Sequence, residues 1–352
     1  MGNFTSTPAP TPAASHTLPT PLPADCAASA RLPDVHEIDS PDLVATLIRL
    51  GLLLPLDRPC HTCATPLSPR LDAAYADGWC LRCWKCRTNF GVRHGSFFAD
   101  FALPLRRLCR LLRSMEAHNN LKVAVAGVAR EHQLGRTTMT KVWKRVRERM
   151  QAYVEAHPVQ FDEDDVVEVD ECYLKPLQKK RDKEAADVKQ PPPTWIIGAV
   201  SRNTGKVSLQ FAPTHSAADV EAAVRPSLPH KSTTVLSDCH KSFKKVFKGS
   251  PYFQSKKKKY GHAKLNMMTY TVETDKGELK VHSNTIEGYW AHFRLAVRNH
   301  TKISIFPVMY ESMYRRLHIS IAAALQVAPV SPDSAAAKSV SAASTLASIA
   351  QS

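Results

Sequence analysis

The sequence predicts an α/β fold in which strands and helices of one large domain follow two smaller modules. Apolar segments typical of buried strands are followed or separated by segments with helical spacing. The strand candidates are Val166–Val169, Trp195–Val200, Val207–Phe211 and Thr233–Leu236, and the helix candidates are Ala217–Val224, Thr285–Val297 and Val308–Leu325. Ser216 is placed to cap the first of these helices. This mixture of strands and helices predicts an α/β domain over residues 162–325.

Charge, apolar segments and cysteine content indicate which classes of protein this chain can belong to. The 352 residues carry a formal net charge of +15, which favours a polyanionic partner such as nucleic acid. The longest apolar stretch, Leu50–Leu56, is interrupted by Gly51 and Pro55, so no membrane-spanning helix is expected. No basic segment followed by an apolar core begins the chain, so no secretory signal is expected. The chain has nine cysteines, and the local cluster of five between Cys60 and Cys86 favours metal binding in a reducing compartment over a disulfide scaffold.

Changes in composition divide the chain into six parts. The two ends are rich in Pro, Ala, Thr and Ser and are predicted to be disordered. Ser40 and Pro41 are expected to start the first helix, as cap and first helical residue. The parts are a tail at 1–38, a helical lead-in at 39–56, a cysteine module at 57–98, a helical region at 100–158, the α/β domain at 162–325 and a tail at 326–352.

Two Cys-x-x-Cys pairs predict a zinc site. Nineteen residues lie between Cys63 of the pair Cys60/Cys63 and Cys83 of the pair Cys83/Cys86. This spacing matches that of zinc sites, and we expect a zinc ribbon in which four thiolates leave no open position for catalysis. Cys80 could replace a ligand, since it also forms a Cys-x-x-Cys with Cys83, and free buried thiols are the alternative to a metal site. Basic side chains around the module could contact phosphates: Arg82, Lys85, Arg87 and Arg93.

Helical segments at Asn120–His132 and Thr137–Val154 flank a short turn with Gly135. This is the spacing of a helix-turn-helix motif. The first residues of the second helix are polar or basic, as in helices that contact bases and phosphates: Arg136, Thr137, Thr138 and Lys141. The alternative is an ordinary helical hairpin with a solvated face.

Three acidic residues, far apart in the sequence, are candidates for a metal centre. Asp170 and Asp238 each follow an apolar strand, and Glu287 lies at the start of a helix. A single such acid is usually a cap or turn residue. Together, however, carboxylates can hold Mg²⁺ or Mn²⁺, and two such ions can activate a nucleophile and stabilise the leaving oxygen of a phosphodiester. The set therefore points to metal-dependent chemistry on DNA strands.

The ordered motifs of the α/β domain resemble a known family. They are Val-Glu-Val-Asp170-Glu171-Cys-Tyr, Trp195-Ile-Ile-Gly198-Ala-Val, Asn203-Thr-Gly-Lys, Ser237-Asp238 and Asn284-Thr-Ile-Glu287-Gly-Tyr-Trp290. This set resembles the Merlin-type DDE transposases of eukaryotes, relatives of bacterial ISXO-like insertion-sequence transposases. The resemblance extends over about residues 57–318, and the Asn284–Trp290 motif is its most specific part.

The resemblance implies an RNase H-like catalytic core, a mixed sheet flanked by helices. It would place Asp170 on the first strand, Asp238 at the end of the fourth and Glu287, as third metal ligand, on a following helix. Asn284 lies one turn before Glu287 and could replace or assist it. Arg294 lies two turns after Glu287 on the same face, where a cation suits a phosphate.

Other residues qualify this resemblance. Glu168 and Glu171 are expected to support the site, Glu168 on the same strand face as Asp170. Relatives often carry Val-Asn-His where this chain has Leu265-Asn266-Met267, and the loop Lys179–Pro193 resembles an insertion. Such departures are expected of a decayed or domesticated copy, which would bind DNA without catalysis, but the three metal-ligand carboxylates are all present.

The resemblance implies a DDE transposase that binds terminal inverted repeats, cleaves DNA and transfers strands with two Mg²⁺ or Mn²⁺ ions and a structural Zn²⁺. Synapsis of two DNA ends implies a homo-oligomer. A nuclear location is expected from the substrate and from the basic runs Lys179–Arg181 and Lys256–Lys259. The alternatives are the domesticated DNA-binding protein and a nuclease or resolvase that cuts without joining.

Overall fold

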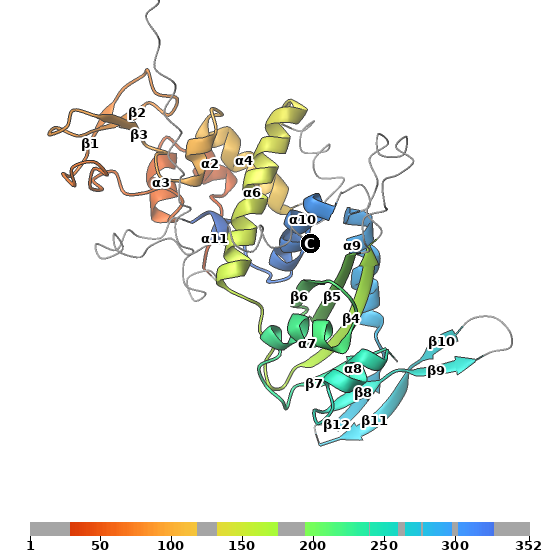
Figure 1. The fold of residues 1–352 in the computed structure, drawn as a ribbon. Coiled ribbons are helices and arrows are strands. Elements are labelled where there is room, and N and C mark those ends of the chain that lie inside the picture. The colour runs from red at the N-terminus through yellow and green to blue at the C-terminus, as the bar shows by residue number, and fades with distance from the viewer. Residues whose placement is uncertain are drawn as a thin grey trace, which may run out of the picture.

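A computed structural model describes residues 29–117, 132–174, 194–238, 240–259, 265–275, 277–297 and 302–326. In Figure 1 the cysteine module and the N-terminal helices lie at one end of the molecule, and the large sheet lies at the other. The predicted loop Lys179–Pro193 and most of both predicted tails lie outside the described residues.

Among the described residues, the N-terminal half holds a small sheet and four α-helices. The helices are α2 (Val35–Asp39), α3 (Leu43–Arg49), α4 (Leu105–Ala117) and α6 (Arg136–Ala156), with a 3-10 turn, η1, at Phe97–Asp100. The cysteine module contains the antiparallel strands β1 (Ser68–Leu71), β2 (Trp79–Arg82) and β3 (Asn89–Gly91). Asp34 and Glu37 form a capping box at α2.

A five-stranded sheet forms the centre of the C-terminal half, with strand order β6-β5-β4-β7-β8. The first three strands are antiparallel, whereas β7 runs parallel to β4, and β8 runs parallel to β7. The strands are β4 (Val166–Leu174), β5 (Thr194–Ser201), β6 (Val207–Ala212), β7 (Thr234–Ser237) and β8 (Tyr252–Gln254). This mixed sheet fits the RNase H-like core that the resemblance implies.

Alternation along β4 directs its side chains to two different cores. Val167 and Val169 pack with α7 (Ala217–Val224) and α8 (Lys241–Val246), whereas Cys172 and Leu174 belong to the core that contains α9 (Asn284–Val297). The sheet is therefore covered by α7 and α8 on one face and by α9 on the other. Ser216 caps α7 as predicted, because its hydroxyl accepts from the Asp219 amide.

The remaining elements complete the chain. Two antiparallel hairpins lie between β8 and α9, made of β9 (Lys256–Lys259) with β10 (Leu265–Met268) and β11 (Tyr270–Thr274) with β12 (Gly277–Val281). A 3-10 turn, η3 (Arg225–Ser227), follows α7, and the last helices within the described residues are α10 (Lys302–Arg315) and α11 (Ile321–Leu325).

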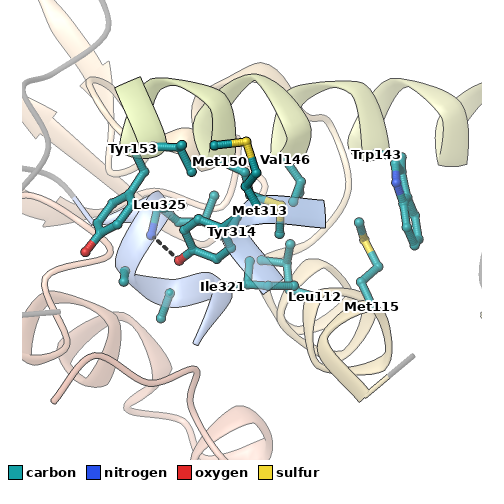
Figure 2. Close-up of a cluster of buried hydrophobic side chains, with 14 of the residues drawn as sticks. Leu112, Met115, Trp143, Val146, Met150, Tyr153, Met313, Tyr314, Ile321 and Leu325 are labelled. Carbon is teal, nitrogen blue, oxygen red and sulfur yellow. Dashed lines mark hydrogen bonds between the residues drawn. The ribbon is translucent and has the colours of Figure 1, made fainter. Parts of the chain in front are cut away.

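One apolar core joins the N-terminal helices to α10 and α11. In Figure 2, Val146 and Met150 of α6 lie over Met313 and Tyr314 of α10, Trp143 of α6 lies beside Met115 of α4, and Ile321 and Leu325 of α11 belong to the same cluster. The Tyr314 hydroxyl is buried and accepts from the Ala324 amide (3.1 Å), so its polar group is satisfied. The helical region and the α/β domain are therefore packed against each other.

Several sequence predictions of local structure were wrong. The predicted tail at 1–38 includes α2, and Leu32 and Ile38 are buried. The helix predicted at Val308–Leu325 is two helices, α10 and α11, with His318 between them at φ 56°. The basic run Lys256–Lys259, which was not among the strand candidates, forms β9. None of the described helices is long and apolar enough to cross a bilayer.

Candidate active site

The register of β4 and β7 brings the two predicted aspartates together. The parallel ladder ends at the pair Val169 and Ser237, so Asp170 and Asp238 are the next residues of two adjacent strands. Carboxylate oxygens of Asp170, Glu171 and Asp238 all lie within 4.8 Å of one another. β4 continues to Leu174, so Asp170 lies inside its strand and not at the strand end that the sequence predicted.

The Asp170 carboxylate lies in an environment that disfavours its charge. Burial and the nearby Glu171 and Asp238 carboxylates raise the pKa of Asp170 to about 8. The Trp290 indole donates a hydrogen bond to Asp170 Oδ2 (3.1 Å) and opposes part of that rise. A divalent cation between these carboxylates would remove their mutual repulsion, so the donor set fits Mg²⁺ or Mn²⁺.

This raised pKa predicts how stability depends on pH. From about pH 4 to about pH 8, folded Asp170 keeps a proton that the unfolded chain, with an ordinary pKa of 3.8, releases. Without Mg²⁺, stability should therefore fall as pH rises through this window, by at most about 1.4 kcal/mol per pH unit. Added Mg²⁺ should stabilise the protein increasingly towards pH 8. Denaturant unfolding of the wild type and Asp170→Asn tests this, and equal pH slopes in the two would contradict it.

Gly198 allows α9 to approach the sheet at the site. It pairs with Asp170 across β4 and β5. A Cβ atom at Gly198 would lie 2.6 Å from the Trp290 ring, closer than any real carbon contact. The missing side chain therefore makes the space in which the Trp290 indole reaches Asp170.

We expect Gly198→Ala to displace Trp290 and to destabilise the protein by about 1–3 kcal/mol through overpacking. Mg²⁺ should also bind more weakly, because the indole that holds Asp170 moves. Gly288→Ala is the matched control, since open space surrounds that position on α9 and alanine favours a helix there by up to about 1 kcal/mol. Thermal unfolding with and without Mg²⁺ measures both effects. Equal behaviour of the two variants would refute the close approach.

Glu168 fixes the start of α9. It is fully buried on the same face of β4 as Asp170, as the sequence predicted. Its carboxylate accepts from Arg202 Nε (2.5 Å), the Thr285 hydroxyl (2.9 Å) and the Ile286 amide (3.0 Å). The ion pair with Arg202 balances the buried charge, and the amide contact satisfies a free donor at the helix N-terminus. Glu168 is therefore a positioning residue for α9.

The other predicted site residues lie on α9. Glu287 is exposed in its first turn and accepts from the Ser283 hydroxyl (2.6 Å). It is outside the Asp170, Glu171 and Asp238 group, although Trp290 lies one turn further along the helix. Asn284 is exposed too. Arg294 lies beside β4, where its charge opposes the rise that burial causes in the pKa of Cys172.

The four predicted zinc ligands lie close together. The Sγ atoms of Cys60, Cys63, Cys83 and Cys86 all lie within 4.8 Å of one another, and the Cys60–Cys86 and Cys63–Cys83 pairs are 3.6 and 3.3 Å apart. A tetrahedral zinc site requires sulfur atoms roughly 3.8 Å apart, so the cluster fits zinc with little movement. Hydrogen bonding with Thr65 lowers the pKa of Cys63 to about 6, which favours a thiolate.

Cys80 is outside this cluster. It is buried on β2, where it pairs with Gly91 of β3 and Arg70 of β1. The choice of Cys83 and Cys86 as ligands thus agrees with the geometry. The expected phosphate contact of Arg93 is wrong, because its guanidinium is buried and pairs with Asp77.

The helix-turn-helix prediction is only partly within the described residues. Residues 118–131, most of its first helix, lie outside them. The second helix is α6, which begins at Arg136, and Thr137 is exposed in its first turn. Thr138 is half-buried, and the Lys141 amine donates to the Asp100 carbonyl (3.0 Å). The motif and its DNA contacts therefore stay a prediction.

Two histidines near the site were missed by sequence reasoning. A nitrogen of His215 and one of His240 lie within 4.8 Å of each other and of a Glu171 oxygen. His240 follows Asp238 by two residues, which was an available signal. His215 precedes α7 in a different loop, and only the fold brings it to the site.

Comparison with known proteins agrees with this geometry. No curated protein matches the chain. Residues 163–306 match the family model described as the ISXO2-like transposase domain. The matched region includes the whole five-stranded sheet, Asp170, Asp238 and α9. The match supports an insertion-sequence type of transposase family, and residues 163–306 are the part of the chain that is similar to its transposase domain.

Proposed function

We propose that the protein is a DDE-type transposase that binds terminal inverted repeats and catalyses metal-dependent DNA cleavage and strand transfer. The observation that carries this proposal is the adjacency of Asp170, on β4, and Asp238, which directly follows the neighbouring parallel strand β7, in a region that matches a transposase domain. A buried, crowded carboxylate pair costs stability, and a catalytic cation gives a reason to retain it.

The carboxylates of Asp170 and Asp238 would hold the catalytic ions, and Glu171 or Glu287 would supply the third acidic ligand. Asn284 remains the alternative on α9. Two bound Mg²⁺ or Mn²⁺ ions would supply activation of the attacking oxygen and stabilisation of the leaving oxygen. Trp290 orients the Asp170 carboxylate, and Glu168 holds the α9 N-terminus against β4. Arg294, exposed on the same helix, would bind a DNA phosphate.

DNA recognition is assigned to the N-terminal half. The zinc ribbon and a helix-turn-helix ending in α6 would bind the inverted repeats, with Arg136, Thr137, Thr138 and Lys141 at the DNA. The net charge of +15 supports phosphate contacts that weaken as salt rises. We further propose that the protein is of the Merlin type, is eukaryotic and acts in the nucleus. We also propose that it acts as a homo-oligomer, since strand transfer joins two DNA ends to one target.

A strand-transfer assay tests this function. The protein is incubated with Mn²⁺, a labelled DNA end cut to expose a 3′-hydroxyl, and a supercoiled target plasmid. The end sequence is taken from inverted repeats in the DNA that flanks the coding sequence. We expect covalent joining of the labelled end to the plasmid, dependent on the divalent ion and lost in Asp238→Asn.

The other outcomes distinguish the rival functions. Cleavage of the end without joining would identify a nuclease or resolvase. Selective, metal-independent binding without cleavage would identify a domesticated DNA-binding protein, and either result would contradict the proposal.

A further inference from the structure

A second group of metal-binding side chains lies on the other face of β4. Side chains alternate along this strand, so Glu171 points away from the face of Glu168 and Asp170 and towards α7 and α8. One atom each of Glu171, His215 and His240 lies within 4.8 Å of the other two. The group adjoins the acidic site, because Glu171 belongs to both.

The loops that carry the two histidines are fixed to each other. His215 precedes α7, and its carbonyl accepts from the hydroxyl of Ser242 in α8 (2.7 Å). His240 immediately precedes α8, and its amide donates to Asp238 Oδ1 (2.8 Å). The rings of His215 and His240 are 4.8 Å apart. The donor atoms are therefore held close together before any ligand binds.

One buried nitrogen of this group lacks the partner that a purely structural cluster would supply. The His240 Nδ1 is buried, and no hydrogen-bond partner for it is present within the described part of the chain. A buried polar atom normally has a partner, and a bound metal ion can be that partner. On the other side, the His215 ring packs against the Trp195 ring at a tilt of 54° (ring centroids 4.3 Å), which limits the orientations of the imidazole.

The donor set selects the kind of ion. Mg²⁺ prefers oxygen ligands, whereas imidazole nitrogen suits zinc and other late divalent transition metals. Two histidines and one glutamate are the three protein ligands of a class of zinc sites that keep a fourth position for water or substrate. The Glu171 carboxylate has two oxygens, so one ligand can serve both this ion and one held by Asp170 and Asp238.

We propose that Glu171, His215 and His240 form a second transition-metal site that binds Zn²⁺, separate from the Cys₄ site and sharing Glu171 with the acidic pair. The site does not depend on the transposase assignment, and its binding test is independent of catalysis. An ion there places positive charge beside Asp170 and Asp238.

Titration of Zn²⁺ into the full-length protein tests this site. The Cys₄ site is first filled with one equivalent of zinc, and excess Mg²⁺ is present to occupy the acidic pair. We expect one further Zn²⁺ to bind, with affinity reduced about 100-fold or more in His215→Ala and in His240→Ala, because each removes a ligand. His230→Ala is the control, since that histidine is exposed, and Asp238→Asn should retain the zinc site.

A spectroscopic measurement on the wild type tests the site without relying on variants that could fail to fold. Co²⁺ is added to protein in which only the Cys₄ site holds zinc. It should give the visible absorption of a low-coordinate site with nitrogen and oxygen ligands, without the charge-transfer band of cobalt thiolates. Absence of a second bound Zn²⁺, or equal affinity in the wild type and His215→Ala, would overturn the proposal. A thiolate band would place the ion at the cysteines and also overturn it.

Discussion

Asp170→Asn is expected to lower the rates of DNA cleavage and strand transfer by roughly 10³-fold or more, the scale of loss when a group acting directly on the reacting atoms is removed. The asparagine keeps the shape of the side chain, and its amide oxygen can still accept from the Trp290 indole. It cannot, however, supply the negative charge that holds a divalent cation between Asp170 and Asp238. The loss should therefore fall on chemistry and Mg²⁺ binding.

The same substitution should not reduce stability or DNA binding, although it reduces catalysis and Mg²⁺ binding. Asp170 is buried beside Glu171 and Asp238, and removal of its charge relieves repulsion in the metal-free protein. The unfolding temperature without Mg²⁺ should rise or stay unchanged, and DNA should bind equally well or slightly more tightly. Asp39→Asn, at an exposed carboxylate that pairs with Arg110, is the control and should retain full activity. An active Asp170→Asn protein would rule out the assigned site.

Cys83→Ala is expected to unfold the cysteine module at residues 57–98. The module has a small core of six buried residues, two of which are the ligands Cys60 and Cys83. Such a core is too small to fold without a metal, whose binding supplies on the order of 10 kcal/mol in structural zinc sites. The variant should lose its Cys₄ zinc, and proteases should cleave within the module while the five-stranded sheet stays protected.

Cys80→Ala is a closely matched control for this prediction. Cys80 is as buried as Cys83 and lies in the same module, yet its sulfur is outside the metal cluster. The substitution leaves a small void and should cost about 1 kcal/mol without loss of zinc. Zinc content by mass spectrometry and limited proteolysis distinguish the two variants. Loss of zinc from both to the same degree would mean that the ligand set is wrong.

Local sequence patterns were enough to predict much of the sheet. Val166–Val169, Trp195–Val200, Val207–Phe211 and Thr233–Leu236 all fall within or overlap strands of the observed sheet. Their apolar runs are long enough to be recognised because the strands are covered on both faces. Lys256–Lys259 has no such pattern, and its pairing with β10 depends on the partner strand.

The site was predictable only in part, because its geometry depends on register. The acidic residues Asp170 and Asp238 were identifiable from their positions after apolar runs, but the pairing of Val169 with Ser237 makes them neighbours. Glu171 joined them because β4 continues past Asp170. His215 arrives from a loop beyond β6, through tertiary contacts that no local pattern encodes.

Anomalous diffraction from crystals soaked in Mn²⁺ is the most direct test of a metal centre at the end of β7. We predict Mn²⁺ density between the carboxylates of Asp170 and Asp238, and the third ligand of that ion will be visible as Glu171, Glu287 or Asn284. A map with Mn²⁺ elsewhere and none between these two aspartates would contradict the assignment of the active site.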